Sequence, residues 1–475
     1  MKARIKFKTI LFGAILLLTV KTVFAQNLNS GIDKPEAERV LGIEEFIELA
    51  AKSDTVFEEI LIEELALQYR KDLKLPARDL VLDAKADYDF FVTQDREEPE
   101  GTVALSKLFP YSGTNVSAAY DTSASFSSAV NSTEFSVAVS QSIAGDAFGK
   151  STRLQNKIIG AEIEVIRHQI VEAYEDYLAE IIWAYYDWYA AYENLNIGRS
   201  SYEDNLKLLN NIEDRRKSSI ALPIDVNKIK LQVLAKKEKL IELEEAYNNK
   251  FNFIQTALRF KNTKVLIPKE PDMYSNFTIS FEEDFGRFWK YSRTYKMLEL
   301  LKSKTSLEVD KEADDLLPSI NLRLGYKMNG DDFEIDNDEG MVFTGLSLKW
   351  PFSDQVDRAE YETAKIQLKK SGLQAINTHY RLFRDIRNLN LQIDRERQLV
   401  ETAKEKISLA RSILVDEEEN YSYGKVTLND YIASVNVLDT NRFNLIEYNT
   451  QYQKLIIEWL RMTDSLIGKK ELIRP

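Results

Sequence analysis

Hydrophobic positions follow two different periods along this chain, and each period predicts a different element. Within residues 80–90 and 320–328, apolar side chains occupy every second position, as in a β-strand with one covered face. Within residues 225–257 and 430–462, mostly apolar positions such as Ile229, Val233 and Leu240 recur in steps of three and four. This is the spacing of helices packed side by side. These two helical stretches repeat each other about 205 residues apart, so the sequence predicts an internal duplication.

Long helices account for most of the remaining chain. Only 10 prolines and 17 glycines occur in 475 residues, and no proline lies between residues 149 and 217. That stretch predicts a helix of roughly 100 Å, at 1.5 Å per residue. A turn at Ser218–Pro223 follows and leads into the first repeated helix. A second long helix, about 355–423, precedes a turn at Gly424 and the second repeated helix, so two long helical hairpins are expected.

The strand-like segments have two interpretations. Amphipathic strands of about ten residues bordered by aromatic side chains match those of a transmembrane barrel. A soluble β-domain produces the same alternation. The first half also holds more strand-like sequence than two strands need. Val103–Phe109 and Asn115–Tyr120 predict an extra hairpin, which the sequence does not place.

The N-terminus has the features of a secretory signal peptide. A basic stretch precedes an apolar run from Ile10 to Val20, and Val23–Phe24–Ala25 is a small-residue cleavage site. The mature chain is expected to begin at Gln26. An uncleaved anchor is the alternative, but the apolar run is shorter than a membrane span. No other segment has an apolar run of spanning length.

Composition excludes several classes of function. The net charge of −13 argues against nucleic acid as a partner, because phosphate binding needs a basic surface. The absence of cysteine excludes disulfides and thiolate metal sites. No nucleophile triad, phosphate loop or paired-acid arrangement is present, so neither an enzyme nor a cofactor is expected.

Two parts of the sequence suggest a metal site, and each has a simpler interpretation. The acidic segment 331–340 offers carboxylates for Ca²⁺, but Gly340 is misplaced for an EF-hand, which favours a solvated loop. His168 and His379 are the only histidines, too few for a metal site within one chain. A ring of three equivalent histidines stays open. We therefore expect no metal site.

Three motifs resemble the TolC-like outer-membrane efflux family, and the resemblance extends over nearly the whole mature sequence. The most specific is the ladder after each turn, which runs Asp225-Val226-x-x-Ile229-x-x-x-Val233 and again Asp430-Tyr431-x-x-Ser434-x-x-x-Leu438. The others are Leu317-Pro318-Ser319-Ile320, at a strand entry, and the segment 345–352, where a strand passes into a helix.

The resemblance implies a mixed architecture, a membrane β-barrel joined to a long α-helical barrel. Three chains would form one shared transmembrane β-barrel and a periplasmic α-helical tunnel. The expected organisation is a signal peptide (1–25), an N-terminal helical or equatorial segment (26–75), a first repeat (76–261, with strands in 78–143 and a helical hairpin in 149–260), an equatorial connector (262–290), a second repeat (291–467, with strands in 319–350 and a hairpin in 355–463) and a C-terminal tail (468–475).

The implied function is passive conduction through an exit duct of a tripartite efflux or type I secretion system. The implied partners are two further copies of the chain, a periplasmic adaptor (membrane fusion) protein, an inner-membrane transporter and outer-membrane lipid. The location would be the cell outer membrane, with an extension into the periplasm. Drugs, metals and proteins remain alternative cargoes. A soluble periplasmic coiled-coil scaffold or adaptor would also explain the heptads, but not the apolar strand faces.

The resemblance also assigns site residues. Asp225 and Tyr421 match positions that link neighbouring helices and close the periplasmic entrance, and Asp430 matches an acidic residue that narrows it. The adaptor-contacting tips would comprise Ser219, Ile220, Ala221, Leu222, Pro223, Tyr423, Gly424, Lys425 and Val426. Helix capping is the alternative role for both aspartates.

Four positions depart from the family pattern. Ala433 stands where a second Asp is usual, and Val426 replaces a basic residue of the closing link. Ser219 stands where Gly is common, and Pro223 is unusual at its position. The usual acidic gate and its locking network are therefore in doubt for this chain.

Overall fold

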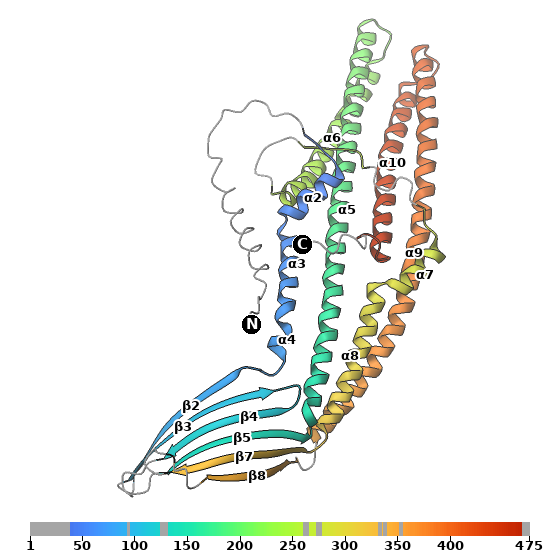
Figure 1. Ribbon diagram of the computed structural model, residues 1–475. Coiled ribbons are helices and arrows are strands. Elements are labelled where there is room, and N and C mark those ends of the chain that lie inside the picture. Colours follow the sequence, from blue (N-terminus) through green and yellow to red (C-terminus); the bar gives the residue numbers. More distant parts are fainter. Residues whose placement is uncertain are drawn as a thin grey trace, which may run out of the picture.

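The protein is an elongated molecule with a curved β-sheet at one end and long helices extending from it (Figure 1). The computed structural model describes residues 39–92, 96–123, 132–259, 266–271, 278–330, 335, 340–350 and 355–467. The expected signal peptide and C-terminal tail lie outside these residues, as does most of the acidic segment 331–340.

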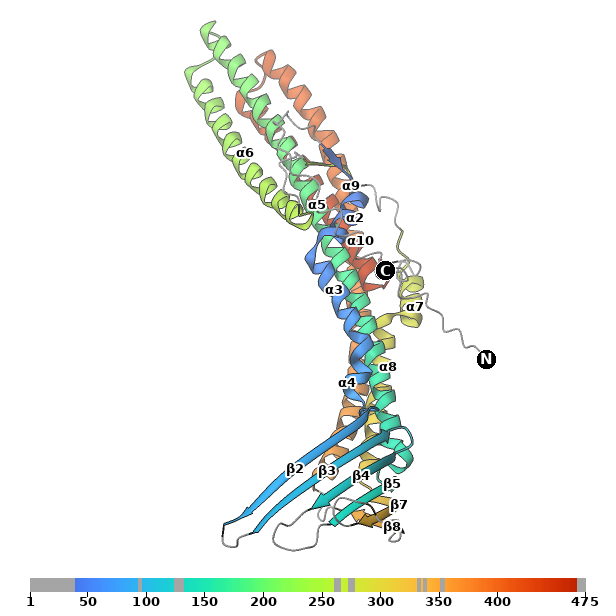
Figure 2. The same ribbon diagram turned by 60° about the vertical axis from the view of Figure 1, so that its left-hand side comes forward.

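Two helical hairpins of equal dimensions form the long axis. Helix α5 (Lys150–Lys217) has 68 residues and turns into α6 (Pro223–Ala257), which has 35. Helix α9 (Gln355–Ser422) and helix α10 (Leu428–Met462) repeat the same two lengths. The shorter helices accompany only the half of each long helix that is farther from the sheet (Figure 2). Nearer the sheet, α3 (Thr55–Ala66) packs on α5, and α8 (Arg293–Asp315) packs on α5 and α9.

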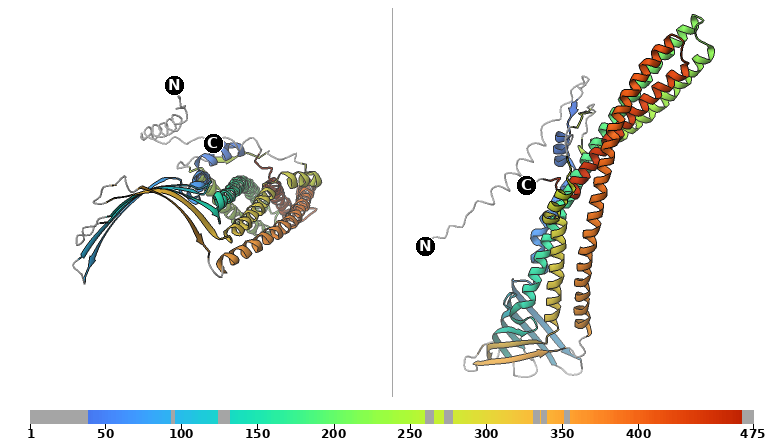
Figure 3. Two further views of the ribbon diagram at one scale, coloured as in Figure 1. Left: turned by 60° about the horizontal axis from the view of Figure 1, so that its bottom comes forward. Right: turned by 90° about the vertical axis from the view of Figure 1, so that its right-hand side faces the viewer.

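The sheet is antiparallel throughout and holds six strands among the described residues. Its order is β2 (Leu80–Phe91), β3 (Arg96–Phe109), β4 (Thr114–Ser123), β5 (Ser132–Ala144), β7 (Ser319–Gly330) and β8 (Gly340–Lys349). The sheet bends into an arc when viewed from its end of the molecule (Figure 3). The two segments that sequence reasoning could not place, Val103–Phe109 and Asn115–Tyr120, pair with each other in β3 and β4.

The two faces of the sheet differ in chemistry. The cross-strand register aligns one apolar residue from each strand on the same face, for example Leu82, Val103, Val116, Val137, Leu324 and Leu346. The opposite face carries polar side chains such as Asp83, Thr102, Ser117, Ser136, Arg323 and Ser347. Leu82 and Leu346 are 67% and 68% exposed, so the apolar face is unusually accessible for a folded protein.

A tight junction fixes the sheet to the helices. Gly113, in the turn between β3 and β4, has a φ of 64°, and Gly149, at the start of α5, has a φ of 73°. A Cβ on Gly149 would lie 2.4 Å from the carbonyl oxygen of Pro110, so only glycine allows this approach. Arg153 donates from Nη1 to the carbonyl oxygen of Tyr111 at 2.7 Å. The β3–β4 turn is thereby held against the base of α5.

Two helical segments are interrupted by polar residues with extended backbone. The first is α2 (Ile43–Ser53), α3, a 3₁₀ turn (Leu67–Tyr69) and α4 (Arg70–Lys74), because Asp54 is extended and caps α3 by accepting from Val56 N at 3.0 Å. The second breaks at Ser292, between α7 (Phe281–Tyr291) and α8. Both interruptions are polar residues with extended backbone, which favours caps over helix interiors.

The main apolar core lies midway along the molecule. Tyr185 and Trp188 of α5 are fully buried there, against Phe46 of α2. The hydroxyl of Tyr185 lies 2.8 Å from the carbonyl oxygen of Leu41 in β1 (Arg39–Leu41), which pairs in parallel with β6 (Leu266–Pro268). Within the described residues, no helix combines the length and apolarity needed to span a membrane.

Candidate functional site at the hairpin tips

The turns at the ends of the two hairpins share one backbone conformation. Ser219 and Gly424 both have left-handed φ angles, 64° and 72°. In each turn the following amide bonds back into the long helix, Ile220 N to Arg215 O at 2.8 Å and Lys425 N to Asn420 O at 2.9 Å. This pattern closes the C-terminus of a helix and normally selects glycine. Ser219 therefore adopts a left-handed backbone conformation that is unfavourable for a residue with a Cβ atom.

Asp225 and Asp430 lie in the first turns of α6 and α10, the return helices of the two hairpins, and both cap their helix. An Asp225 Oδ2 accepts from Leu222 N at 3.3 Å. Asp430 Oδ2 accepts from both the amide and the hydroxyl of Thr427, at 3.0 and 2.7 Å. The Thr427 hydroxyl and amide hold the pKa of Asp430 below its ordinary range. The capping interpretation therefore applies to both residues, and Asp430 stays ionised and exposed at neutral pH.

Tyr421 lies between the two hairpins. Its ring stacks on Tyr431 with centroids 5.7 Å apart, and the Arg215 guanidinium lies 5.1 Å from the centre of the Tyr421 ring. Burial raises the pKa of Tyr421, while the charge of Arg215 opposes that rise and the charge of Asp225 adds to it. The structure thus brings Tyr421 and Asp225 together, and Asp430 contacts Thr427 instead.

Arg215 is a site residue that sequence reasoning missed. The sequence lacks the expected basic residue at Val426, but Arg215 supplies a guanidinium from the last turn of α5. The run Arg215-Arg216-Lys217 at that helix end was the available signal, because basic residues near a helix C-terminus also satisfy the dipole.

A small apolar cluster joins the two tips. Ile212, Ala221, Ile229 and Leu428 are buried together, with Tyr421 and other side chains packed around them. Three tip residues point outward instead: Ile220, Leu222 and Tyr423 are 73%, 62% and 66% exposed. The tips therefore have a firm base and an apolar outer surface.

A buried ion pair farther along the shaft also connects the hairpins, and sequence reasoning missed it. Lys236 Nζ of α6 lies 2.7 Å from Asp439 Oδ2 of α10, and their side chains are only 15% and 7% exposed. Ser201 of α5 donates a hydrogen bond to the same carboxylate. Gln232 of α6 donates to Asn436 of α10 at 2.7 Å. Polar residues within the apolar ladder were the signal for these contacts.

A second charged cluster lies near the middle of the molecule. Arg293 is surrounded by three carboxylates, at 3.3 Å from Glu172, 3.1 Å from Asp464 and in contact with Glu175. Burial raises the pKa of Glu175 to about 7, although Arg293 opposes the shift. The three carboxylates also meet the geometric requirement for a metal site. The guanidinium already neutralises part of their charge, so the arrangement is that of an ion-pair network.

The two histidines occupy different surroundings. His379 Nδ1 lies 2.8 Å from the Tyr295 hydroxyl, and its ring contacts Trp289 at a centroid distance of 3.9 Å. His168 lines a cavity of about 640 Å³ beside Arg293, and burial lowers the pKa of His168.

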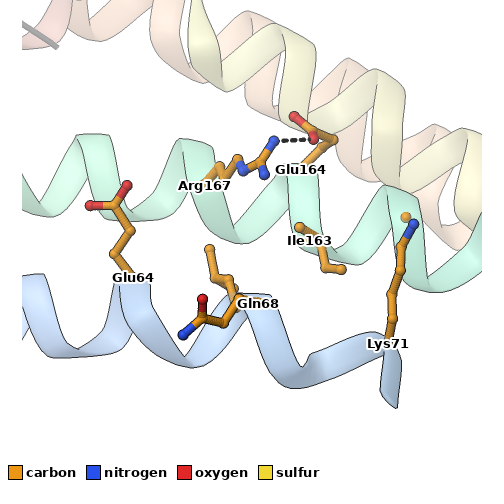
Figure 4. Close-up of a pocket in the computed structure, with 8 residues that line it drawn as sticks. Glu64, Gln68, Lys71, Ile163, Glu164 and Arg167 are labelled. Atoms are coloured by element: carbon orange, nitrogen blue, oxygen red, sulfur yellow. Dashed lines mark hydrogen bonds and ion pairs between the residues drawn. The ribbon is translucent and has the colours of Figure 1, made fainter. Parts of the chain in front are cut away.

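Another cavity, of about 350 Å³, lies between the N-terminal helices and α5 (Figure 4). Charged side chains such as Lys71 and Arg167 line it, which is typical of a solvated surface groove.

Residues 298–457 match the sequence model of the family described as outer membrane efflux protein. This part of the chain is therefore similar to the outer membrane efflux proteins. The matched region includes most of α8, both strands of the second repeat and nearly all of the second hairpin. No curated protein sequence matches the chain significantly.

Solved structures of outer-membrane proteins share the fold of this chain. The outer-membrane channel OprN aligns with a TM-score of 0.71 at 14% identity, covering 89% of this chain and 90% of that one. VceC from Vibrio cholerae aligns at 0.69 with 13% identity, covering 89% and 95%. CmeC of Campylobacter jejuni aligns at 0.67 with 13% identity, covering 94% and 95%.

These findings confirm the family resemblance in residues 298–457 and the fold class expected from the sequence. The chain shares with those structures the combination of an antiparallel β-sheet and long helical hairpins. The roles of Asp225, Tyr421, Asp430 and the tip residues remain proposals.

Proposed function

We propose that this protein is the outer-membrane exit duct of a tripartite efflux or type I secretion system. Three copies would pool their sheets into one transmembrane barrel and their hairpins into a periplasmic tunnel. Substrates would pass through passively, because energy comes from an inner-membrane transporter. The family consists of ducts, and we assign this chain no catalytic activity and no cofactor.

The observation that carries the proposal is the exposed apolar face of the sheet. Leu82, Leu324 and Leu346 are 67%, 55% and 68% exposed, and the register places them on one face. In water such a surface would drive aggregation, whereas in lipid it is stabilised. The opposite, polar face then lines an aqueous lumen.

A single copy cannot form this pore. A six-stranded sheet that stays open leaves backbone donors and acceptors at its edges, and lipid cannot satisfy them. Closure therefore requires further copies, and we propose three of them in line with the family resemblance. The lipid-facing sheet and the oligomer follow from the same physical requirement.

The hairpin tips would bind the periplasmic adaptor protein. Their apolar outer residues, Ile220, Leu222 and Tyr423, provide anchors of the kind that carry binding energy at interfaces. The same tips would form the entrance, with Tyr421, Arg215 and Asp225 holding the hairpins together. Three copies of Asp430 would create a ring of carboxylates that attracts cations.

The proposal is tested by purification from outer-membrane fractions and by recording in planar bilayers. We expect oligomers that resist detergent, fall apart on heating and conduct ions. A protein released without detergent as a monomer that does not conduct would refute the duct. That result would favour the alternative of a soluble periplasmic scaffold or adaptor.

A further inference from the structure

The six-stranded sheet ends in two strands whose outer edges have no strand partner among the described residues. These are β2, which begins after the N-terminal helices, and β8, which leads into α9. Because the sheet has an even number of antiparallel strands, β2 and β8 run in opposite directions. Strand β8 of one copy and β2 of the next can therefore continue the same antiparallel ladder.

The stagger of the strands fixes where these edges meet. Leu80 is the first residue of β2, at the helical end of the sheet. Leu80 pairs with Lys107 on β3, and each partner in turn pairs with a residue of the next strand. Across the sheet this series runs Lys107, Val116, Val139, Leu324 and Thr344. Thr344 lies five residues from Lys349, the helical end of β8. Five steps between strands thus accumulate a stagger of five residues, or one residue per strand.

A stagger of one residue per strand is the geometry of a closed barrel. With about 3.4 Å per residue and about 4.8 Å between strands, it corresponds to a strand tilt of about 35°. Membrane barrels have tilts of roughly 35–45°. A sixth step, across the boundary between copies, would add one more residue and place Thr344 opposite residue 86 of the neighbour.

We propose that β8 of one copy pairs with β2 of the next in this register, closing an 18-stranded barrel from three copies. The pairs would be Thr344 with Ala86, Leu346 with Ala84, and Leu348 with Leu82. The inference rests on the proposed trimer and specifies its interface. A shift of six residues is even, so apolar side chains meet apolar ones. A shift of one residue more or less would turn Asp83 or Lys85 toward lipid.

The alternative is a 12-stranded barrel from which the β2–β3 hairpin is excluded. Strand β4 would then supply the edge, and the same stagger would place Leu348 opposite Val116. Two observations oppose this alternative. The β3–β4 ladder is uninterrupted from Glu100 to Phe109, and its turn is held against α5 by Arg153. The outward face of β2 is also apolar, with Leu80 and Leu82 59% and 67% exposed.

The two barrels differ in width. Eighteen strands with this tilt give a backbone diameter of about 34 Å, and 12 strands give about 23 Å. The wider barrel would have the strand number of porin-type channels, whose lumen is filled with water. The β2–β3 hairpin would thus enlarge the exit and line part of it with its own polar face.

Cysteine crosslinking distinguishes the two arrangements, because the natural chain has no cysteine. The test variant carries Leu82→Cys with Leu348→Cys, and the rival variant carries Val116→Cys with Leu348→Cys. Facing residues on antiparallel strands lie about 4.5–5.5 Å apart between Cα atoms, within disulfide range. Leu348→Cys with Ala86→Cys is the control for register, displaced by about 13 Å along the strand.

Each variant is oxidised in native outer membranes and examined on non-reducing gels after boiling. We expect reducible dimers and trimers for the Leu82 pair, and monomers for the Val116 and Ala86 pairs. Crosslinking of the Val116 pair instead would overturn the 18-stranded barrel and leave the duct intact. A heat-sensitive oligomer that no pair crosslinks would also overturn the register. The absence of any oligomer would refute the proposed function itself.

Discussion

At the scale of single residues, the two aspartates that begin the return helices have separable roles. Both accept hydrogen bonds from the residue three positions earlier, as helix caps do. Asp225 lies near the Tyr421 and Arg215 pair, whereas Asp430 is exposed and its carboxylate accepts hydrogen bonds from Thr427. Capping requires an acceptor oxygen, but attraction of cations requires charge. An amide substitution therefore separates the two roles.

We predict that Asp430→Asn lowers cation selectivity while the helix remains capped. Asparagine can accept the same hydrogen bonds from Thr427, but three neutral side chains no longer attract cations. The reversal potential in a salt gradient should shift so that cation and anion permeabilities approach each other. Asp225→Asn is the matched control and should keep the original selectivity. If Asp430→Asn keeps it too, the carboxylate ring is not the selective element.

At the scale of elements, polar contacts connect helices of the two hairpins, α6 and α10. The Lys236–Asp439 pair is buried between α6 and α10, whereas Lys217–Asp214 at the end of α5 is 76% and 73% exposed. A buried charge that loses its partner is strongly destabilising, whereas exposed pairs contribute little. The two pairs thus allow a matched comparison.

Asp439→Ala should destabilise the packing of the two hairpins by about 3–5 kcal/mol, because it leaves Lys236 buried without a counter-charge. Asp214→Ala should change stability by less than about 0.5 kcal/mol. The double variant Lys236→Met with Asp439→Leu should recover most of the loss. Hydrogen exchange of α6 and α10 amides would measure these differences. Equal protection in Asp439→Ala and the natural protein would contradict the structural role of the pair.

The Arg293 cluster predicts a stability that depends on pH. Because burial raises the pKa of Glu175 to about 7, the folded protein binds a proton that the unfolded chain releases near pH 4.5. The folded state therefore loses stability as pH rises between about 4.5 and 7, and the loss is complete above that range. Thermal unfolding of Glu175→Gln should show a smaller decline across this interval. A smaller dependence of stability on pH should remain in this variant, because burial also raises the pKa of Glu172.

At the scale of the whole molecule, the two ends carry the two kinds of contact that the proposed duct would need. The sheet presents an exposed apolar face, and the hairpin tips present exposed apolar residues at the opposite end (Figure 1). The long helices connect the two ends, and buried ion pairs and hydrogen bonds hold these helices together. A change at the tips should therefore affect partner binding without changing barrel assembly.

Ile220→Asp should weaken binding of the periplasmic adaptor by about tenfold or more, as loss of a central apolar anchor does. The heat-sensitive oligomer and its conductance should remain unchanged. Ile220→Val is the conservative control and should preserve adaptor capture. Quantitative pull-down of the adaptor from crosslinked cells would measure the effect. Normal capture by Ile220→Asp would exclude this tip from the docking surface.

The sequence alone determined the elements, because hydrophobic periodicity and helix breakers are local properties. It predicted the long hairpins, their turns and amphipathic strands such as Ile320–Met328. It could not place the β3–β4 segments or identify Arg215 as the partner of Tyr421, since both depend on contacts between distant parts of the chain. Only the tertiary structure gave the order of six strands and their stagger. Cross-strand register is a relation between segments, and it decides how the sheet can close.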